Sequence, residues 1–271
     1  MSTKITFRER GQGDVLILLH GYGGGVQHWE QVAQSLMPHY RVVIPNLSHL
    51  YLSSDNKVVF AEQVRIFAEF IREHFPDQKV TVAGFSYGGA LTWALGLTFP
   101  ELVNNVILIN PMVADPVRYF QPLELKFFFN VPLNLKSVFL MLSTPMGRTF
   151  LKRAAQIFRD ERTEGNVAIE KLQGRKLQFV AHLIHHFSWI LRSENWIQWH
   201  VRLKKYRCQT RIIFDTEDLL FSKETYHQFA KHLACDDIIS LTGGGHLVIK
   251  TRPENIAKHI REFLEQAKIA A

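Results

Sequence analysis

The chain has 271 residues, 46% of them hydrophobic and 12% aromatic, which excludes a disordered protein and predicts a large buried core. Only two cysteines are present, Cys208 and Cys235, and we find neither a secretion signal nor an apolar run of about 18 residues, so the sequence predicts a cytoplasmic protein without a membrane span. The net charge of +7 is concentrated in residues 116–207, where 16 Lys and Arg stand against 6 Asp and Glu, but no nucleic-acid-binding motif accompanies it and we exclude nucleic acid as a partner.

The predicted elements alternate between strands and helices. Lys4–Glu9 is expected to add an antiparallel edge strand. Short segments rich in Val, Ile and Leu predict six buried strands: Asp14–His20, Tyr40–Pro45, Lys79–Ala83, Asn105–Asn110, Thr210–Asp215 and Asp237–Leu241. Helix-like segments lie between or after them: Val26–Met37, Ala61–His74, Tyr87–Phe99, Lys223–Ala234 and Pro253–Gln266. This order predicts an α/β protein with a mostly parallel sheet flanked by helices.

One interval breaks the alternation. Residues 115–207 contain apolar segments with helical spacing and basic residues between them, and prolines mark their entrance. We therefore predict a core of residues 1–114 and 208–271 and a helical cap of residues 115–207. In open α/β sheets ligands bind outside the carboxyl ends of the strands, so this cap would cover the site.

The segment from Val80 to Ala90 contains the most informative motif. An apolar strand runs into Gly84-Phe-Ser86-Tyr-Gly88 and then directly into a helix-forming segment. Such a strand-to-helix turn exposes the serine hydroxyl and leaves the next backbone N–H available. The pentapeptide alone is a weak signal, and its value depends on finding partners for Ser86.

A serine nucleophile needs a base, and one histidine stands out among thirteen. His246 follows a run of three glycines, after the last predicted strand and before the C-terminal helix. The acid that orients the base is expected where Arg211–Asp218 ends a strand in three carboxylates. We favour Asp218 because it lies further into the loop, with Asp215 and Glu217 as competitors.

A glycine-rich turn after the first core strand, from His20 to Gly25, predicts an oxyanion hole. The backbone N–H groups of Tyr22 and Tyr87 are its expected donors, and His20 is expected to brace the loop. The glycines do not have the spacing of a nucleotide-binding loop. No cofactor is expected. His182 and His186 have the i,i+4 spacing of some metal sites, but no carboxylate lies between them, and we assign no metal.

Together these motifs resemble the α/β-hydrolase superfamily, and in particular its cap-bearing serine esterase and lipase-like members. The matching segments are Leu18-Leu-His-Gly-Tyr22, Gly84-Phe-Ser-Tyr-Gly-Gly89, Asp215-Thr-Glu-Asp218 and Gly244-Gly-His246. The resemblance implies that Ser86 is the nucleophile, Asp218 the acid and His246 the base, with the Tyr22 and Tyr87 amides as oxyanion hole. The loop Asn46–Ser54 departs from the family, because it lacks the usual acid and glycines.

The sequence thus predicts a serine hydrolase for a carboxylic ester with an apolar, lipid-like acyl or alkyl part. The apolar segments Leu123–Phe129 and Leu135–Leu142 would supply an acyl pocket or simply pack the cap, and with the basic excess they are compatible with contact with an anionic membrane. A hydrolase of carbon–carbon bonds and an acyl-CoA thioesterase are alternatives on the same fold. A non-catalytic binding protein on this scaffold is the alternative from another class.

Overall fold

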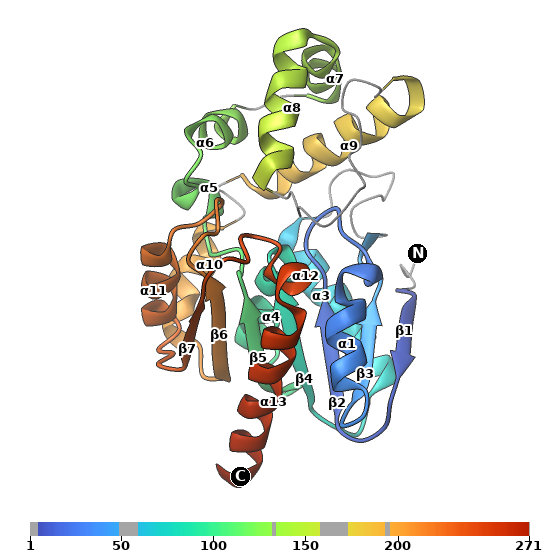
Figure 1. Ribbon diagram of the computed structural model, residues 1–271, viewed down its shortest axis with the longest axis vertical. Coiled ribbons are helices and arrows are strands. Elements are labelled where there is room, and N and C mark those ends of the chain that lie inside the picture. The colour runs from blue at the N-terminus through green and yellow to red at the C-terminus, as the bar shows by residue number, and fades with distance from the viewer. Residues whose placement is uncertain (1–4, 49–58, 132–133, 158–172, 193–195, 271) are drawn as a thin grey trace.

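A twisted sheet forms the centre of the molecule in the computed structural model, which describes residues 5–48, 59–131, 134–157, 173–192 and 196–270 (Figure 1). Within these residues the sheet has seven strands in the order β1-β3-β2-β4-β5-β6-β7. β1 is antiparallel to β3 and every other pair is parallel. The strands are β1 (Phe7–Arg10), β2 (Val15–Leu19), β3 (Arg41–Pro45), β4 (Val80–Phe85), β5 (Val103–Ile109), β6 (Gln209–Asp215) and β7 (Ile238–Leu241). The predicted strands and the antiparallel edge are confirmed.

Helices cover both faces of this sheet. They are α1 (Glu30–Leu36), α3 (Phe60–His74), α4 (Tyr87–Thr98), α11 (Lys223–His232), α12 (Val248–Thr251) and α13 (Pro253–Ala270). α1, α12 and α13 pack on one face, and α3, α4 and α11 pack on the other (Figure 1). The helix predicted over Val26–Met37 is interrupted, because Val26–Trp29 forms a 3₁₀ turn, η1, that buries Trp29 before α1 begins.

The alternation of side chains along the central strands explains the two cores. All five residues of β2 are buried, with Ile17 and Leu19 in the core under α3 and α4, and Leu16 and Leu18 in the core under α1 and α13. Successive side chains of a strand point to opposite faces, so an unbroken apolar run is what a strand covered on both faces requires.

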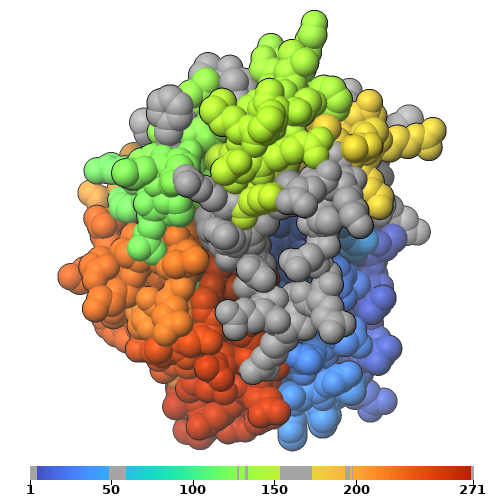
Figure 2. All heavy atoms as spheres, turned by 45° about the horizontal axis from the view of Figure 1, so that its top comes forward, coloured from blue at the N-terminus to red at the C-terminus, as the bar shows by residue number. Residues whose placement is uncertain are grey.

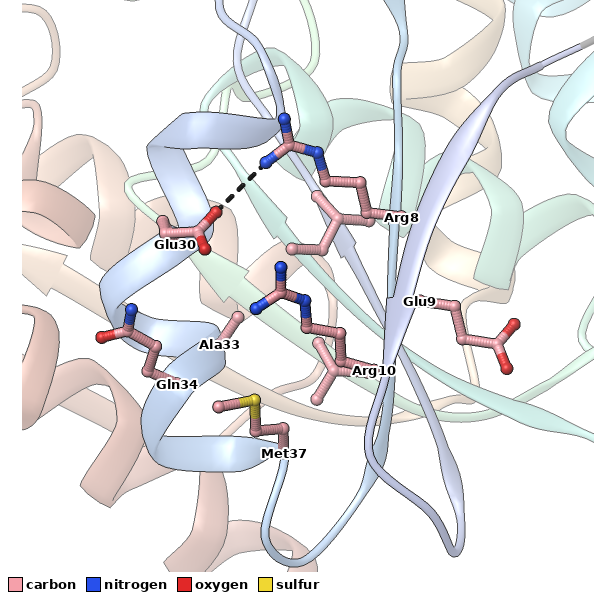
Figure 3. Close-up of a pocket in the computed structure, with 9 residues that line it drawn as sticks. Arg8, Glu9, Arg10, Glu30, Ala33, Gln34 and Met37 are labelled. Atoms are coloured by element: carbon pink, nitrogen blue, oxygen red, sulfur yellow. Dashed lines mark hydrogen bonds and ion pairs between the residues drawn. The ribbon is translucent and has the colours of Figure 1, made fainter.

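The edge strand β1 is polar and partly covered by α1 (Figure 3). Arg8 and Arg10 point toward α1, where Arg8 forms an ion pair with Glu30 at 3.3 Å, while Glu9 points away and accepts a hydrogen bond from Arg41 at 2.8 Å. Charged side chains on an edge strand disfavour pairing with the edge of another molecule.

The segment between β5 and β6 is helical. It contains α5 (Pro116–Tyr119), α6 (Leu123–Asn130), α7 (Leu135–Ser143), α8 (Pro145–Ile157), α9 (Gly174–Ile190), α10 (Ile197–Arg202) and a 3₁₀ turn, η4 (Leu203–Lys205). α6, α7, α8 and α9, hereafter the cap helices, form the end of the molecule beyond the carboxyl ends of the strands (Figure 1). α7, α8 and α9 share a small core of their own, made by Val138, Leu142, Leu151, Leu177 and Ala181. The division into a core and a cap at residues 115 and 207 stays a prediction.

The end of the helical segment packs differently from the cap helices. Trp196 and Trp199 lie in the main core, where both rings contact Phe60 of α3 and Trp93 of α4. These two tryptophans therefore serve packing. No helix among the described residues is long and apolar enough to cross a bilayer.

Candidate active site

Ser86 lies at the turn between β4 and α4 in a backbone conformation that non-glycine residues rarely adopt, with φ 54° and ψ −117°. Three hydrogen bonds hold it there. Its N–H donates to the Ile109 carbonyl at 3.1 Å, and its own carbonyl accepts from the N–H groups of Ala90 and Met112. The expected strand-to-helix turn is therefore present, and strain at this position is the kind that the surrounding structure must enforce.

The glycines around Ser86 allow three segments to meet closely. A Cβ on Gly88 would lie 2.3 Å from the Leu19 carbonyl oxygen, and one on Gly84 would lie 2.3 Å from the Gly88 carbonyl oxygen. Any side chain at these positions would separate α4 from the ends of β2 and β4. A Cβ on Gly21 would likewise lie 3.2 Å from the Cβ of Ser86, so the glycine-rich loop after β2 rests directly against the serine.

His246 reaches Ser86 from the loop between β7 and α12. Its Nε2 lies 3.1 Å from the Ser86 Oγ, and both residues are almost fully buried. The loop can turn here because Gly243 and Gly245 adopt positive φ angles of 79° and 62°. The structure thus brings together two side chains that are 160 positions apart in the sequence.

Asp218 holds the other nitrogen of this imidazole. The His246 Nδ1 lies 2.9 Å and 3.1 Å from the two carboxylate oxygens of Asp218. Because Nδ1 faces a carboxylate, it carries the proton, which leaves Nε2 to accept from the serine hydroxyl. The same carboxylate accepts from the Leu220 N–H at 2.7 Å and from the Tyr226 hydroxyl at 2.5 Å.

The two competing carboxylates lie elsewhere. Asp215 accepts hydrogen bonds from the N–H groups of Glu217 and Gly244 at 2.9 and 2.8 Å, so it stabilises the two loops that carry Asp218 and His246. Glu217 is exposed. Of the three carboxylates, Asp218 is the one that contacts the imidazole.

Tyr22 and Tyr87 belong to the two segments that meet at Ser86. Tyr22 belongs to a turn closed by a hydrogen bond from the Gly24 N–H to the Gly21 carbonyl, and Tyr87 is the first residue of α4. Their rings meet edge to face with centroids 5.6 Å apart. The structure therefore brings both residues of the expected oxyanion hole next to Ser86.

The side chain of Tyr22 also links this loop to the cap helix α9. Its hydroxyl donates to the Leu183 carbonyl at 3.0 Å and lies 2.8 Å from Nδ1 of His186, while its ring stacks on Phe187 at 4.3 Å. The pKa of His186 is lowered to about 4, mainly by burial and additionally by the neighbouring His182 and His185. Among the described residues, no group of three His, Cys, Asp or Glu could hold a metal ion.

His20 braces the loop, as expected. Its Nδ1 lies 2.9 Å from the Gly21 carbonyl, and its Nε2 accepts from the Leu47 N–H at 3.0 Å. Burial lowers its pKa to about 4, so the ring is neutral and can accept that hydrogen bond. The unusual loop Asn46–Ser54 is described only as far as Ser48, and its remainder lies outside the described residues.

Sequence reasoning missed two residues of the site. Asn110, fully buried after β5, donates from Nδ2 to the carbonyls of Gly245 and His246 at 3.0 and 2.9 Å and accepts from the Asp215 N–H at 2.8 Å. Tyr226 on α11 supports Asp218. The only signal for Asn110 was a polar residue at the carboxyl end of a buried strand, and Tyr226 had none.

The chain is similar to several known proteins. The model of a family described as alpha/beta hydrolase fold matches residues 14–253. A pimeloyl-[acyl-carrier protein] methyl ester esterase of Vibrio campbellii is 29% identical over 167 residues, and the match spans 58% of this chain and 64% of the relative. A 2-hydroxy-6-oxo-6-phenylhexa-2,4-dienoate hydrolase of Comamonas testosteroni is 26% identical over 178 residues, with coverages of 63% and 58%. The chain thus matches less than two thirds of the length of either relative.

A solved structure described as a membrane phospholipase A, a bacterial virulence factor, has a TM-score of 0.72. Its sequence is 22% identical, and the match covers 97% of this chain and 83% of the chain in that structure. A likeness at this identity indicates a shared fold.

Proposed function

The chain belongs to the α/β-hydrolase family, and on this premise we propose that it hydrolyses carboxylic esters with Ser86 as the nucleophile. The observation that carries the proposal is the unbroken series of contacts from the Ser86 Oγ through both nitrogens of His246 to the carboxylate of Asp218. A relative named as a methyl ester esterase supports the same reaction class.

The first step is attack of the serine oxygen on the ester carbonyl. A serine hydroxyl is a weak nucleophile at neutral pH, so its proton must leave as the new bond forms. His246 Nε2, at 3.1 Å, takes this proton. The imidazolium that results lies against the carboxylate of Asp218, which stabilises the positive charge and fixes the orientation of the ring.

The negative charge of the tetrahedral intermediate forms on the former carbonyl oxygen. We assign its stabilisation to the backbone N–H groups of Tyr22 and Tyr87, which flank Ser86 on two different segments. Donors fixed in advance in a buried site can lower the barrier without reorganising during the reaction. The alcohol then leaves with the proton from His246, and water releases the acyl group from Ser86 by the same steps in reverse order.

We propose that the substrate has an apolar acyl or alkyl part. Aromatic rings continue from the site into the cap helices, from Tyr22 to Phe187 of α9 and on to Phe129 of α6, with centroids 4.3 and 5.5 Å apart. The relative from Vibrio campbellii is named for the ester of an acyl chain, which supports this substrate class. No step of the mechanism uses a cofactor.

A panel of p-nitrophenyl esters with increasing acyl length tests the proposal. We expect hydrolysis with a preferred chain length, and the loss of that activity in Ser86→Ala. Ser188→Ala is the matched control, because Ser188 is also a buried serine but lies on α9. Hydrolysis that survives in Ser86→Ala at the wild-type rate would contradict the proposal.

A carbon–carbon bond hydrolase is the second candidate, because a relative is named as a dienoate hydrolase. The same three side chains would serve that reaction. Measuring kcat/KM for a 2-hydroxy-6-oxo-dienoate beside the esters separates the two, since a clear preference for the dienoate would favour the second candidate.

A further inference from the structure

The cap helices carry much of the positive charge of this protein. Their described side chains include six lysines and arginines and a single acidic residue, Glu124. The whole chain has a net charge of +7. The bases are Lys126, Lys136, Arg148, Lys152, Arg175 and Lys176, spread over all four cap helices.

These charges are not where helix stability would place them. The first turns of α7, α8 and α9 contain no acid, and Lys136, Arg175 and Lys176 lie in the first turns of α7 and α9. The helix dipole makes a positive charge unfavourable at that end. In the core, by contrast, α3, α11 and α13 each have a glutamate in the first turn. The basic residues of the cap helices therefore call for a reason outside helix stability.

Large apolar side chains are also exposed on the cap helices. Leu123, Leu140, Met146 and Phe179 are 73%, 55%, 77% and 49% exposed, and each lies on a different cap helix. They are separate from the buried cluster through which α7, α8 and α9 pack together. The cap helices form the end of the molecule that faces the viewer at the top of Figure 2, so these side chains belong to the same end as the basic residues.

We propose that the cap helices dock on the surface of a lipid bilayer that contains anionic phospholipids. Lysine and arginine would contact the lipid phosphates, and the four apolar side chains would enter the boundary between headgroups and acyl chains. The separation of the apolar side chains over four helices favours a bilayer over an acidic protein. A bilayer accepts separate apolar side chains one by one, whereas a protein interface requires one closely packed and shape-complementary patch.

Flotation with extruded vesicles tests the charge requirement. We expect the full chain to float with vesicles of phosphatidylcholine and phosphatidylglycerol and to remain behind with vesicles of phosphatidylcholine alone. The variant Lys136→Glu/Arg175→Glu/Lys176→Glu should bind the anionic vesicles ~100-fold more weakly, because each basic residue near the surface adds roughly a factor of five. Glutamate is favourable in the first turn of a helix, so weaker binding would not reflect unfolding of α7 or α9.

A matched variant with the same change in net charge shows whether vesicle binding depends on the cap helices or only on the net charge of the protein. Arg10→Glu/Lys79→Glu/Lys258→Glu alters three exposed bases of the core, on β1, before β4 and on α13. We expect it to retain most of the binding. Equal loss in the two triple variants, or equal binding to both kinds of vesicle, would overturn the proposal.

The apolar side chains are tested separately with Leu140→Ser/Phe179→Ser, which should weaken binding to anionic vesicles without changing the charge. Ser86→Ala should bind like the wild type, which keeps this result independent of the proposed hydrolysis. If the wild type fails to float with anionic vesicles, the proposal is wrong. Saturable binding to a purified acidic protein instead, abolished by the same triple variant in the cap helices, would assign the surface to a protein partner.

Discussion

Four helices of the core and three of the cap helices differ in the charges at their ends. α1, α3, α11 and α13 begin with an acid, and α3, α11 and α13 also end with a base, so their charges complement the helix dipole. α7, α8 and α9 have neither an acid in the first turn nor a base in the last turn. These core helices thus have terminal charges that stabilise them, whereas α7, α8 and α9 do not.

The residues of the proposed active site also belong to the core and not to the cap helices. Ser86, Asp218 and His246 all come from loops at the carboxyl ends of core strands, and the residues that hold them, Asn110 and Tyr226, belong to the core as well. The cap helices contribute the contacts of α9 with Tyr22. We infer that the core fixes the reaction, while the cap helices determine where and on which substrates it occurs.

The largest effect is expected when Ser86, the proposed nucleophile of the core, is replaced. Ser86→Ala should lower kcat by ~10⁶-fold, because the group that forms the covalent intermediate is lost. The change deletes a single oxygen, so the folded structure should persist, as circular dichroism and thermal unfolding can verify. The control in α9, Ser188→Ala, should retain activity within about twofold.

Replacement of Asp218 separates it from its neighbour Asp215. Asp218→Asn should lower kcat by ~10⁴-fold, since an amide no longer selects the imidazole tautomer that can accept the serine proton. Asp215→Asn should mainly lower the unfolding temperature, because Asp215 anchors the backbone of Glu217 and Gly244. A larger loss of kcat in Asp215→Asn than in Asp218→Asn would contradict our assignment.

Two buried histidines make stability depend on pH. The pKa of His20 in the core and of His186 on α9 is lowered from 6.5 to about 4, mainly by burial. The unfolded chain therefore binds protons that the folded protein does not. The free energy of unfolding should be fully retained above pH 6.5 and lost as the pH falls toward 4, by about 3 kcal/mol for each histidine.

Chemical denaturation between pH 4 and 7 tests this prediction. In His186→Gln the slope of the unfolding free energy against pH should decrease by about one proton. His39→Gln, which replaces an exposed histidine, is the control variant. A wild-type protein equally stable at pH 4.5 and 7 would contradict the burial argument.

Tyr226 tests how the core supports its acid. Tyr226→Phe removes one donor from the carboxylate of Asp218, and we expect kcat to fall by about tenfold with KM unchanged. Tyr206→Phe removes an equally buried hydroxyl, bonded to Thr210, and should leave kcat unchanged.

The smallest effect concerns the helix termini themselves. Arg175→Glu and Lys176→Glu on α9 should each raise the free energy of unfolding by about 0.5 kcal/mol, whereas Glu224→Lys on α11 should lower it. Thermal unfolding at low salt measures both. If the variants of α9 and the variant of α11 changed the free energy of unfolding in the same direction, the contrast between the two sets of helices would be contradicted.

The positions of the strands along the chain and the turn at Ser86 could be predicted because both depend on short segments. Unbroken apolar runs indicated strands buried on both faces, and glycines next to the serine indicated close crossings. The histidine loop followed from its place after the last strand. The sequence narrowed the acid to three carboxylates, and Asp218 was preferred among them for its depth in the loop.

What could not be predicted depends on contacts between distant segments. Asn110 bonds to residues 105 to 136 positions away, and the contacts of Tyr22 on α9 are 161 and 164 positions away. Neither residue carries a local pattern that reveals its partner. The break between η1 and α1 also escaped prediction, since Val26–Met37 has a continuous helical pattern and the burial of Trp29 is a tertiary effect.

The central claim is that Ser86 is activated for nucleophilic attack, and labelling with a fluorophosphonate measures this directly. We expect the folded protein to gain one adduct, which peptide mapping by mass spectrometry locates on Ser86, with hydrolytic activity lost in parallel. A folded, hydrolytically active sample that stays unmodified, or an adduct on another residue, would contradict the account.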